Sequence, residues 1–344
     1  DFVTYYVSLG YYNEDGIYKS SSRENKYNTN TTYERFNYRT NINLNLTNTT
    51  VVRVGIGGWL VNRNAPGSQS TDIWGSFANY TPLTFPRRYS SGEWPARTPE
   101  VLMTQTGYRR IWQNKMETNI GVEQNLNFIT PGLNFYGVFA FDTDNRNTII
   151  RSKLPEIWVA QNYRDQDGSL ILRRINNEEL MTQTSATEGN KRYYLQAQLD
   201  YSRLLLENHR VGVFAMAYLQ EVMNTNLGED IIASIPKKNL AYSGRFTYSL
   251  FDRYLAEFNW GYTGSENFAV GHQYGFFPAY SGAWNIAEEP FIKDNQDWLE
   301  MFKVRFSHGK VGNDNMGERF PYLYSIEGGG AGYNWGTSSY PKTY

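Results

Sequence analysis

Cysteine is absent from this chain of 344 residues, and histidine occurs only three times. The absence of cysteine excludes disulfide scaffolds, cysteine-ligated zinc, iron–sulfur clusters and cysteine nucleophiles. The three histidines, His209, His272 and His308, stand far apart in the sequence and form no metal-type pair. We therefore expect no metal site and no other cofactor.

An excess of charge of either sign is also missing. The 33 Lys and Arg residues are balanced by 34 Asp and Glu residues, and charged residues make up only 19% of the chain. Without a net positive field, binding to nucleic acid by simple electrostatics is not expected. No apolar run of roughly 18 residues occurs, which excludes a transmembrane helix.

Each candidate catalytic motif in the sequence lacks a residue or a context that its chemistry requires. Residues 55–60 lack the third glycine of a dinucleotide fingerprint, and no helix follows them. Glu288 and Glu289 are adjacent, so in an extended chain their carboxylates point to opposite sides and do not form a glycosidase pair. His308 has no triad partner nearby, and no P-loop, zinc or EF-hand pattern is found. We expect no enzymatic activity.

The chain is rich in aromatic residues, and in several segments polar and apolar residues alternate at every second position. Aromatic residues make up 16% of it, and glycine occurs 30 times. Over residues 33–46, 116–126, 192–202 and 302–307, polar side chains alternate with apolar ones, as in half-buried strands. The pattern predicts eleven strands, centred near 3–12, 33–46, 51–62, 107–129, 133–143, 191–204, 211–222, 239–250, 253–264, 275–287 and 298–308.

The predicted connections alternate between short and long. Short ones lie near 47–50, 130–132, 205–210 and 251–253, and long ones near 13–32, 63–106, 144–190 and 223–238. In an up-and-down sheet, alternate connections lie at opposite edges, so one edge carries tight turns and the other long loops, as in outer-membrane barrels. Several strands reach the roughly 9–11 residues that cross a membrane. We predict an all-β, antiparallel, up-and-down transmembrane barrel, with residues 1–344 in one domain.

The alternation also assigns the two faces of the predicted wall. The polar set, which would line the lumen or contact a plug within it, is Arg35, Arg39, Lys303 and Arg305; the apolar set, which would face lipid, is Phe36, Ile42, Leu195, Leu199, Val304 and Phe306. Strand 211–222 is apolar on both faces, so its inside is left open. Aromatic residues near one short turn and at the end of the following strand predict two interfacial girdles; they are Tyr248, Phe251, Tyr254, Trp260 and Tyr262.

The long connection 63–106 is the candidate for contact with a substrate or partner. It contains aromatic side chains among Asn, Asp and Pro, and from them we select Trp74, Tyr80, Tyr89 and Trp94. Two interpretations remain open. The aromatic rings capture carbohydrate or peptide, or they pack the loop into a lid or against a partner protein.

A family resemblance is carried by residues 276–289, FFPAYSGAWNIAEE, and 303–313, KVRFSHGKVGN. Their F-P-x-x-S-x-x-W hairpin and R-x-S-x-G-x-x-G-N strand end resemble SusC/RagA-like TonB-dependent transporters of the Bacteroidota. Weaker similarity lies at residues 5–17, 33–39 and 81–86. His308 departs from the family's usual Tyr, and the sequence 263–265 is Thr-Gly-Ser in place of Asp-Gly-Ser.

The resemblance implies a plugged barrel of 22 strands, of which about half is present here. It implies an integral outer-membrane protein in contact with lipid, energised through TonB, capped by a SusD-like surface lipoprotein and used for uptake of oligosaccharides or peptides. No residue matches the plug or the TonB box. Both ends look cut from a longer polypeptide: residues 1–10 resemble a strand under way, and residues 328–336 a loop.

Two alternatives stay open at this point. A soluble all-β carbohydrate-binding or hydrolytic protein, such as a sandwich or propeller, would also alternate and contain many aromatic residues, but its sheet faces would be covered by protein. A passive porin or a siderophore receptor would share the barrel, and only the motif resemblance argues against it.

The face assignment predicts the effect of a charge placed on one side of residues 192–202. In the intact protein, Leu199→Lys at the middle of a bilayer should cost roughly 2–4 kcal/mol of folding free energy, because it places a cation in hydrocarbon. Gln198→Lys, on the lumen face, should cost little. Folding titrations in lipid vesicles measure both, and equal costs would contradict the assignment.

Overall fold

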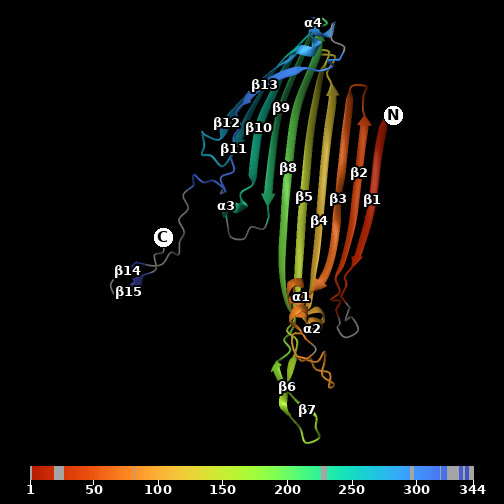
Figure 1. Ribbon diagram of the computed structural model, residues 1–344, viewed down its shortest axis with the longest axis vertical. Coiled ribbons are helices and arrows are strands. Elements are labelled where there is room, and N and C mark those ends of the chain that lie inside the picture. Colours follow the sequence, from red (N-terminus) through yellow and green to blue (C-terminus); the bar gives the residue numbers. More distant parts are fainter. Residues whose placement is uncertain are drawn as a thin grey trace. The chain divides into compact units, whose positions relative to one another are not determined.

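The computed structural model describes residues 2–18, 27–81, 83–225, 231–294, 298–317, 319–323, 333–335 and 338–340. Its main sheet has eleven strands in the order β1-β2-β3-β4-β5-β8-β9-β10-β11-β12-β13 (Figure 1). The strands are β1 (Val3–Asp15), β2 (Thr32–Asn45), β3 (Thr50–Pro66), β4 (Gly107–Asn125), β5 (Leu133–Ser152), β8 (Thr182–Leu205), β9 (His209–Asn224), β10 (Lys237–Leu250), β11 (Tyr254–Ser265), β12 (Tyr274–Asn285) and β13 (Lys303–Gly309). Among the described residues β1 and β13 have a neighbour on one side only, so the sheet is open.

Short elements occupy the connections. They are α1 (Ser70–Asn79), α2 (Pro99–Thr104), β6 (Ile157–Arg164), β7 (Leu170–Asn176), α3 (Ile231–Ser234), η1 (Ile286–Glu288), α4 (Pro290–Lys293), β14 (Tyr333–Trp335) and β15 (Ser338–Tyr340). β6 pairs with β7 and β14 with β15 in separate two-stranded sheets. Across the described ranges, no helix combines the length and apolarity needed to cross a membrane.

The eleven predicted strands are confirmed in number and order. The structure differs in the long connections, where α1, α2 and the β6–β7 hairpin were not predicted. It also differs in β5 and β8, which extend far beyond the predicted 133–143 and 191–204. The extensions are mostly polar, and the adjacent Ile149 and Ile150 of β5 point to opposite faces, so the extensions carry no alternation of hydropathy. Pro82, residues 328–332 and Gly336, used in the sequence interpretation, lie outside the described residues. Residues 333–335 of the predicted loop 328–336 form β14 instead.

Internal packing divides the chain into two units. The first comprises Asp1–Gln124, Val138–Tyr194 and Val222–Glu229, and the second comprises Asn125–Gly137, Leu195–Glu221 and Asp230–Tyr344. We describe each unit by itself. A single domain over residues 1–344 stays a prediction.

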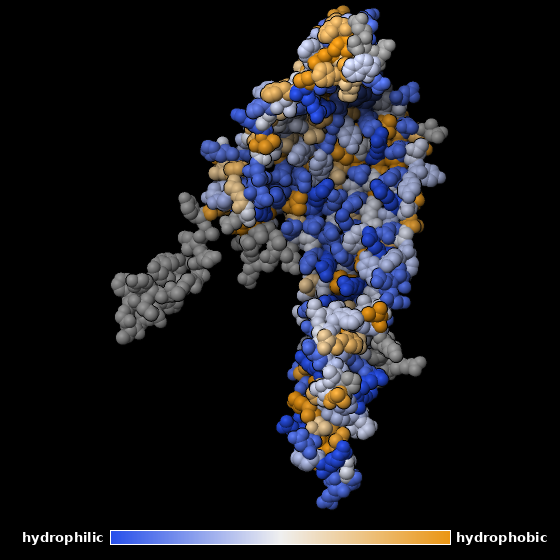
Figure 2. Space-filling model, viewed as in Figure 1, coloured by the Kyte–Doolittle hydropathy of each residue, from blue (hydrophilic) through white to orange (hydrophobic). Residues whose placement is uncertain are grey.

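In the first unit, the pairing of β1 to β4 sorts side chains cleanly by face. Rows across the four strands on one face are Tyr5–Ile42–Val54–Ile120, Val7–Thr40–Ile56–Thr118 and Leu9–Tyr38–Gly58–Met116. This face is apolar yet open, with Leu9 81% and Tyr5 77% exposed. Rows on the opposite face are Tyr6–Asn41–Gly55–Asn119, Ser8–Arg39–Gly57–Glu117 and Gly10–Asn37–Trp59–Lys115. Hydrophilic side chains predominate over the strands in the face that Figure 2 shows.

In the second unit, β10 to β13 repeat the same division. One face carries the rows Leu250–Tyr254–Trp284–Val304 and Tyr248–Ala256–Gly282–Phe306, and the other carries Ser249–Leu255–Ala283–Arg305 and Thr247–Glu257–Ser281–Ser307. The predicted faces of Val304, Phe306, Lys303 and Arg305 are therefore confirmed.

The face of β9, which its sequence left open, follows from two side-chain contacts. The His209 ring hydrogen-bonds the Tyr248 hydroxyl at 2.7 Å, so the odd positions of β9 share the apolar face. The Arg245 guanidinium lies 5.7 Å from the ring centre of Phe214, which places the even positions on the polar face.

Aromatic pairs mark the two ends of the apolar face in the second unit. Tyr254 and Trp284 stack with ring centres 6.4 Å apart at one end of β11, and Tyr262 and Tyr274 stack at 5.0 Å at the other. Two separated aromatic groups are the arrangement expected of interfacial girdles, since amphipathic rings favour the boundary between water and hydrocarbon.

A buried carboxylate organises the connection between β12 and β13. Glu289 is only 6% exposed, and its Oε1 accepts hydrogen bonds from the Tyr254 hydroxyl at 2.7 Å and the Trp284 indole N–H at 2.9 Å. Arg253 Nη1 lies 3.5 Å from its other oxygen. The Tyr254 hydrogen bond first, then the Trp284 bond and the Arg253 charge, lower the pKa of Glu289 against the opposing effect of burial. The tryptophan and the second glutamate of the FFPAYSGAWNIAEE motif thus join two strands to one connection.

The Glu289 cluster should make the protein less stable as the pH falls. Because the folded pKa of Glu289 lies below its ordinary value of about 4.3, its stabilisation is complete above that value and is lost as pH falls through the folded pKa. Glu289→Gln should lower the thermal unfolding midpoint of the full-length protein at pH 7, and the difference from wild type should shrink below about pH 4.

Glu288→Gln is the matched control, since the Glu288 carboxylate forms an exposed pair with Lys293 at 2.7 Å and exposed pairs contribute little. The measurement is the folded fraction on unheated SDS gels against temperature. Equal midpoints for both variants at pH 7 would contradict the role of Glu289.

Candidate functional site: a polar trough on the β1–β4 wall

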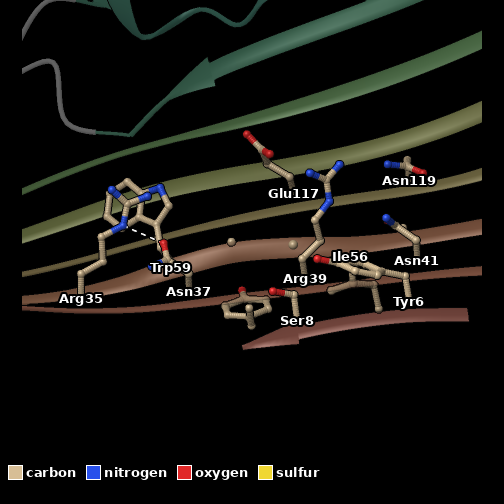
Figure 3. A pocket seen from close by; sticks show the side chains of 14 residues that line it. Tyr6, Ser8, Arg35, Asn37, Arg39, Asn41, Ile56, Trp59, Glu117 and Asn119 are labelled. Atoms are coloured by element: carbon tan, nitrogen blue, oxygen red, sulfur yellow. Dashed lines mark hydrogen bonds between the residues drawn. The ribbon is translucent and has the colours of Figure 1, made fainter. Parts of the chain in front are cut away.

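A trough of about 470 Å³ crosses the polar face of β1 to β4. Its walls and floor come from three successive rows of the sheet, so four strands contribute side chains to one surface. Figure 3 shows Arg35, Asn37, Arg39 and Asn41 following one another along β2, with Glu117 and Asn119 on β4. Because alternate residues of a strand share a face, a run of polar residues at every second position lines one surface continuously.

Two glycines of β3 leave the floor of the trough open. Gly57 lies directly between Arg39 and Glu117 in the register, and it has no side chain to separate them. A Cβ at Gly57 would meet nothing nearer than 3.6 Å, so the space above it is free. At Gly55 the Asn119 amide occupies that space, where a Cβ would lie 2.8 Å from its oxygen.

One end of the trough is held rigidly. The Arg35 guanidinium lies 5.3 Å from the ring centre of Trp59, and its Nε donates a hydrogen bond of 2.8 Å to Asn37 Oδ1. Stacking on an indole and a hydrogen bond in the guanidinium plane fix both the position and the orientation of Arg35.

The charges of the trough are not balanced internally. Glu117 Oε1 lies 2.5 Å from Lys115 Nζ, so its carboxylate already has a cation. Arg39 has no ion-pair or hydrogen-bond partner among the residues that the structure describes, and neither do the Asn41 and Asn119 amides. The trough therefore offers an exposed guanidinium flanked by two amides whose hydrogen-bonding capacity is unused.

The four aromatic residues predicted for contact do not converge on one place. Trp74, on α1, is 52% exposed and lies 5.5 Å from the Phe77 ring. Tyr80 follows α1 and donates its hydroxyl hydrogen bond to the carbonyl of Phe85 at 2.6 Å. Trp74 alone of the four is largely exposed.

The other two predicted residues pack against β6. Tyr89 is buried, and its hydroxyl accepts a hydrogen bond of 3.0 Å from the N–H of Ala160. Trp94 accepts one at its carbonyl from the N–H of Trp158 at 2.8 Å, while the Arg88 guanidinium lies 4.5 Å from its ring centre. Their contacts match the lid interpretation of the loop; a role of the four residues in binding stays a prediction.

The trough contains the predicted lumen residues Arg35 and Arg39. It also contains neighbours that the sequence analysis did not select as site residues. Trp59 and Gly57 were missed because strand 51–62 has no strict alternation of polar and apolar residues to assign its faces. Asn119 lies in the alternating segment 116–126, but the sequence alone does not place it beside Asn41. The available signal was the hydropathy of strand 51–62, since Val52, Val54 and Ile56 share the apolar face when Gly57 lies opposite Arg39. Across the described part of the chain, no group of three or more His, Asp or Glu residues is placed to hold a metal.

Comparison with known proteins agrees with this geometry. No family model matches the chain. Over 134 residues it is 34% identical to the TonB-dependent receptor SusC of Bacteroides thetaiotaomicron, covering 37% of this chain and 13% of the receptor. Over 342 residues it is 25% identical to TonB-dependent receptor P26 of Formosa agariphila, covering 90% of this chain and 31% of the receptor.

Solved structures show the same fold. The RagAB peptide transporter superposes on all of this chain and 38% of its own, with a TM-score of 0.56 and 13% identity. The "open-open" state of the RagAB peptide importer superposes on 89% of this chain with the same TM-score and 15% identity. The chain spans at most about a third of the curated relatives that it matches.

An open antiparallel sheet with one apolar and one polar face is therefore a segment of β-barrel wall. The predicted resemblance to the SusC/RagA-like TonB-dependent transporters is confirmed, over part of their length. The relatives are named as receptors and transporters, and not as enzymes.

Adjacent glycines of β3 allow a paired test of the wall. A Cβ at Gly58, on the apolar face, would lie 2.0 Å from the Lys115 carbonyl oxygen, so Gly58→Ala must separate β3 from β4. We expect a cost of about 1–3 kcal/mol, as for overpacked cores. Gly57→Ala should be tolerated, since its methyl group enters the open trough. Urea unfolding of the full-length protein in lipid vesicles measures both, and the register is wrong if their midpoints coincide.

Proposed function

We propose that this chain forms part of the wall and outer loops of a TonB-dependent transporter in the outer membrane. The transporter imports oligosaccharides or peptides, draws energy through TonB and works with a SusD-like surface lipoprotein. The peptide part of this substrate set is supported by the name of the RagAB peptide transporter, and the oligosaccharide part follows the resemblance to the SusC/RagA-like family. The chain supplies the polar lumen surface on one face and the lipid contact on the other.

The observation that carries the proposal is the two-faced register of β1 to β4 and of β10 to β13. Neighbouring strands pair antiparallel by backbone hydrogen bonds along their length, as a hydrocarbon environment requires. The apolar face exposes large side chains continuously from strand to strand, and lipid is the solvent that covers such a face at no cost.

The soluble alternative is disfavoured by that same face. A soluble sandwich or propeller covers its apolar sheet faces with protein, and an uncovered face of this extent would aggregate. Here Phe306 is 73% exposed at the second unit's face, as Tyr5 and Leu9 are at the first. A passive porin or siderophore receptor would share the wall, and the similarity to SusC and to the RagAB structures favours the present proposal over both.

The sidedness of the wall can be tested with thiols, because the chain itself has no cysteine. Asp167→Cys places a thiol on the turn between β6 and β7, at the end of the long loops, and Asn48→Cys places one in the β2–β3 turn. Both positions are exposed. In cells producing the full-length protein, a membrane-impermeant maleimide should label Asp167→Cys in intact cells and Asn48→Cys only after lysis.

Deletion of TonB should abolish uptake through the full-length protein and leave both labelling patterns unchanged. Equal labelling of the two thiols in intact cells, or recovery of the protein in the soluble fraction, would contradict the proposal. Uptake that persists without TonB would support a passive porin instead.

A further inference from the structure

The Arg39 guanidinium is the charged group in the trough that has no ion-pair or hydrogen-bond partner among the described residues, and it determines which kind of ligand the trough can bind. On this wall Glu117 is paired with Lys115, and Glu123 Oε2 lies 2.7 Å from Arg53 Nη2. Arg35 is occupied by Trp59 and Asn37, whereas Arg39 has no such partner among the described residues. Its side chain is exposed, so a ligand reaches it from the lumen side without any rearrangement of the strands.

The surroundings of Arg39 favour an acceptor of hydrogen bonds. Its planar fork of N–H donors matches the two oxygens of a carboxylate. In the register, Asn41 follows it along β2 and Asn119 faces Asn41 across Gly55, so two amide N–H₂ groups lie beside the same opening. The empty space above Gly57 leaves room for the bound group directly over the strand.

The charge of the ligand is limited by Glu117, which shares the row of Arg39. Its repulsion grows with the charge of the incoming group, so a dianion such as phosphate is penalised more than a single carboxylate. Lys115 compensates Glu117. Arg35 lies four residues from Arg39 along β2 and is held against Trp59 and Asn37, so its charge is screened from a group bound at Arg39. Among the described residues, Arg39 is then the one uncompensated cation of its row, and a single carboxylate balances it.

We propose that the trough binds a carboxylate of the transported molecule, with Arg39 as the residue that contacts it and Asn41 and Asn119 as flanking donors. The proposal rests on the proposed function, since it takes this face to be the lumen. The carboxylate belongs either to an acidic sugar or to a peptide. The imported molecule is in both cases negatively charged at the point where it passes this section of wall.

The test measures the affinity of purified full-length protein in detergent for matched probes. Tri-galacturonate and its trimethyl ester differ in charge but share the sugar, and N-acetyl-tetra-alanine and its C-terminal amide differ only at the terminal carboxylate. One acid of these two pairs should bind at least 10-fold more tightly than its uncharged partner, and the pair concerned identifies the source. Arg39→Gln should weaken that acid by roughly 10- to 100-fold, because the glutamine amide replaces only one of the two hydrogen bonds that the guanidinium donates, and leave the uncharged partner unchanged.

Two further variants sharpen the result. Arg39→Lys keeps the charge and loses the planar fork, so it should recover only part of the affinity. Arg53→Gln, on the same wall outside the trough, removes a cation that is already paired and should leave the affinity unchanged. Raising the salt concentration should weaken binding of the acid by wild type more than by Arg39→Gln.

Three results would overturn the proposal. Equal affinity for each acid and its uncharged partner would mean that binding in the trough does not depend on the carboxylate of the ligand. Inorganic phosphate displacing the acid probe more strongly than acetate would mean that the site is built for a dianion. A loss of thermal stability in Arg39→Gln without a change in probe affinity would assign Arg39 to a contact within the protein. The thiol labelling and the TonB dependence above are independent of all three, so the proposed transport function survives or fails separately.

Discussion

The strict alternation of side chains across a continuous hydrogen-bonded sheet is the constraint on which the rest of this structure depends. Because the backbone groups between neighbouring strands are paired with each other, the polarity of the two faces is set by the side chains alone, and the faces can differ completely. One slip of register would exchange the faces and place Arg39 among apolar residues. The trough, the aromatic groups and the Glu289 cluster all exist only while that register holds.

The strands and the polar face of β2 could be predicted from the sequence, but the residues that form the trough could not. Alternation predicted eleven strands and placed Arg35 and Arg39 on the polar side. The residue opposite Arg39 depends on the β2–β3 turn, where Thr47 and Thr50 exchange two backbone hydrogen bonds. Continued without interruption, that pairing would set Gly58 against Arg39. The ladder pairs Asn45 with Val51 instead, so Leu46 is an extra residue and Gly57 faces Arg39.

A bulge of one residue leaves no clear mark in composition, which explains why the site was harder to predict than the fold. The hydropathy of β3 gives the only independent check. With Gly57 opposite Arg39, Val52, Val54 and Ile56 join the apolar rows; with Gly58 there, they would line the polar face. The loops are less predictable still. Tyr89 resembles a binding residue in sequence because it stands among polar neighbours, and only the distant β6 strand shows that its hydroxyl is used in packing.

Glu289 and Arg39 differ in whether their charged groups have partners within the described part of the protein. That difference distinguishes a structural residue from a candidate binding residue. Glu289 is buried and receives two hydrogen bonds and a nearby guanidinium, so no capacity is left for a ligand and its role is to fix one connection. Arg39 is exposed, lies over a strand position without a side chain and has its donors unused among the described residues. The fold gains little from Arg39, since an exposed cation contributes almost nothing to stability. A guanidinium that the fold does not need, presented with two amides on the polar face, is therefore best explained by something that passes along that face.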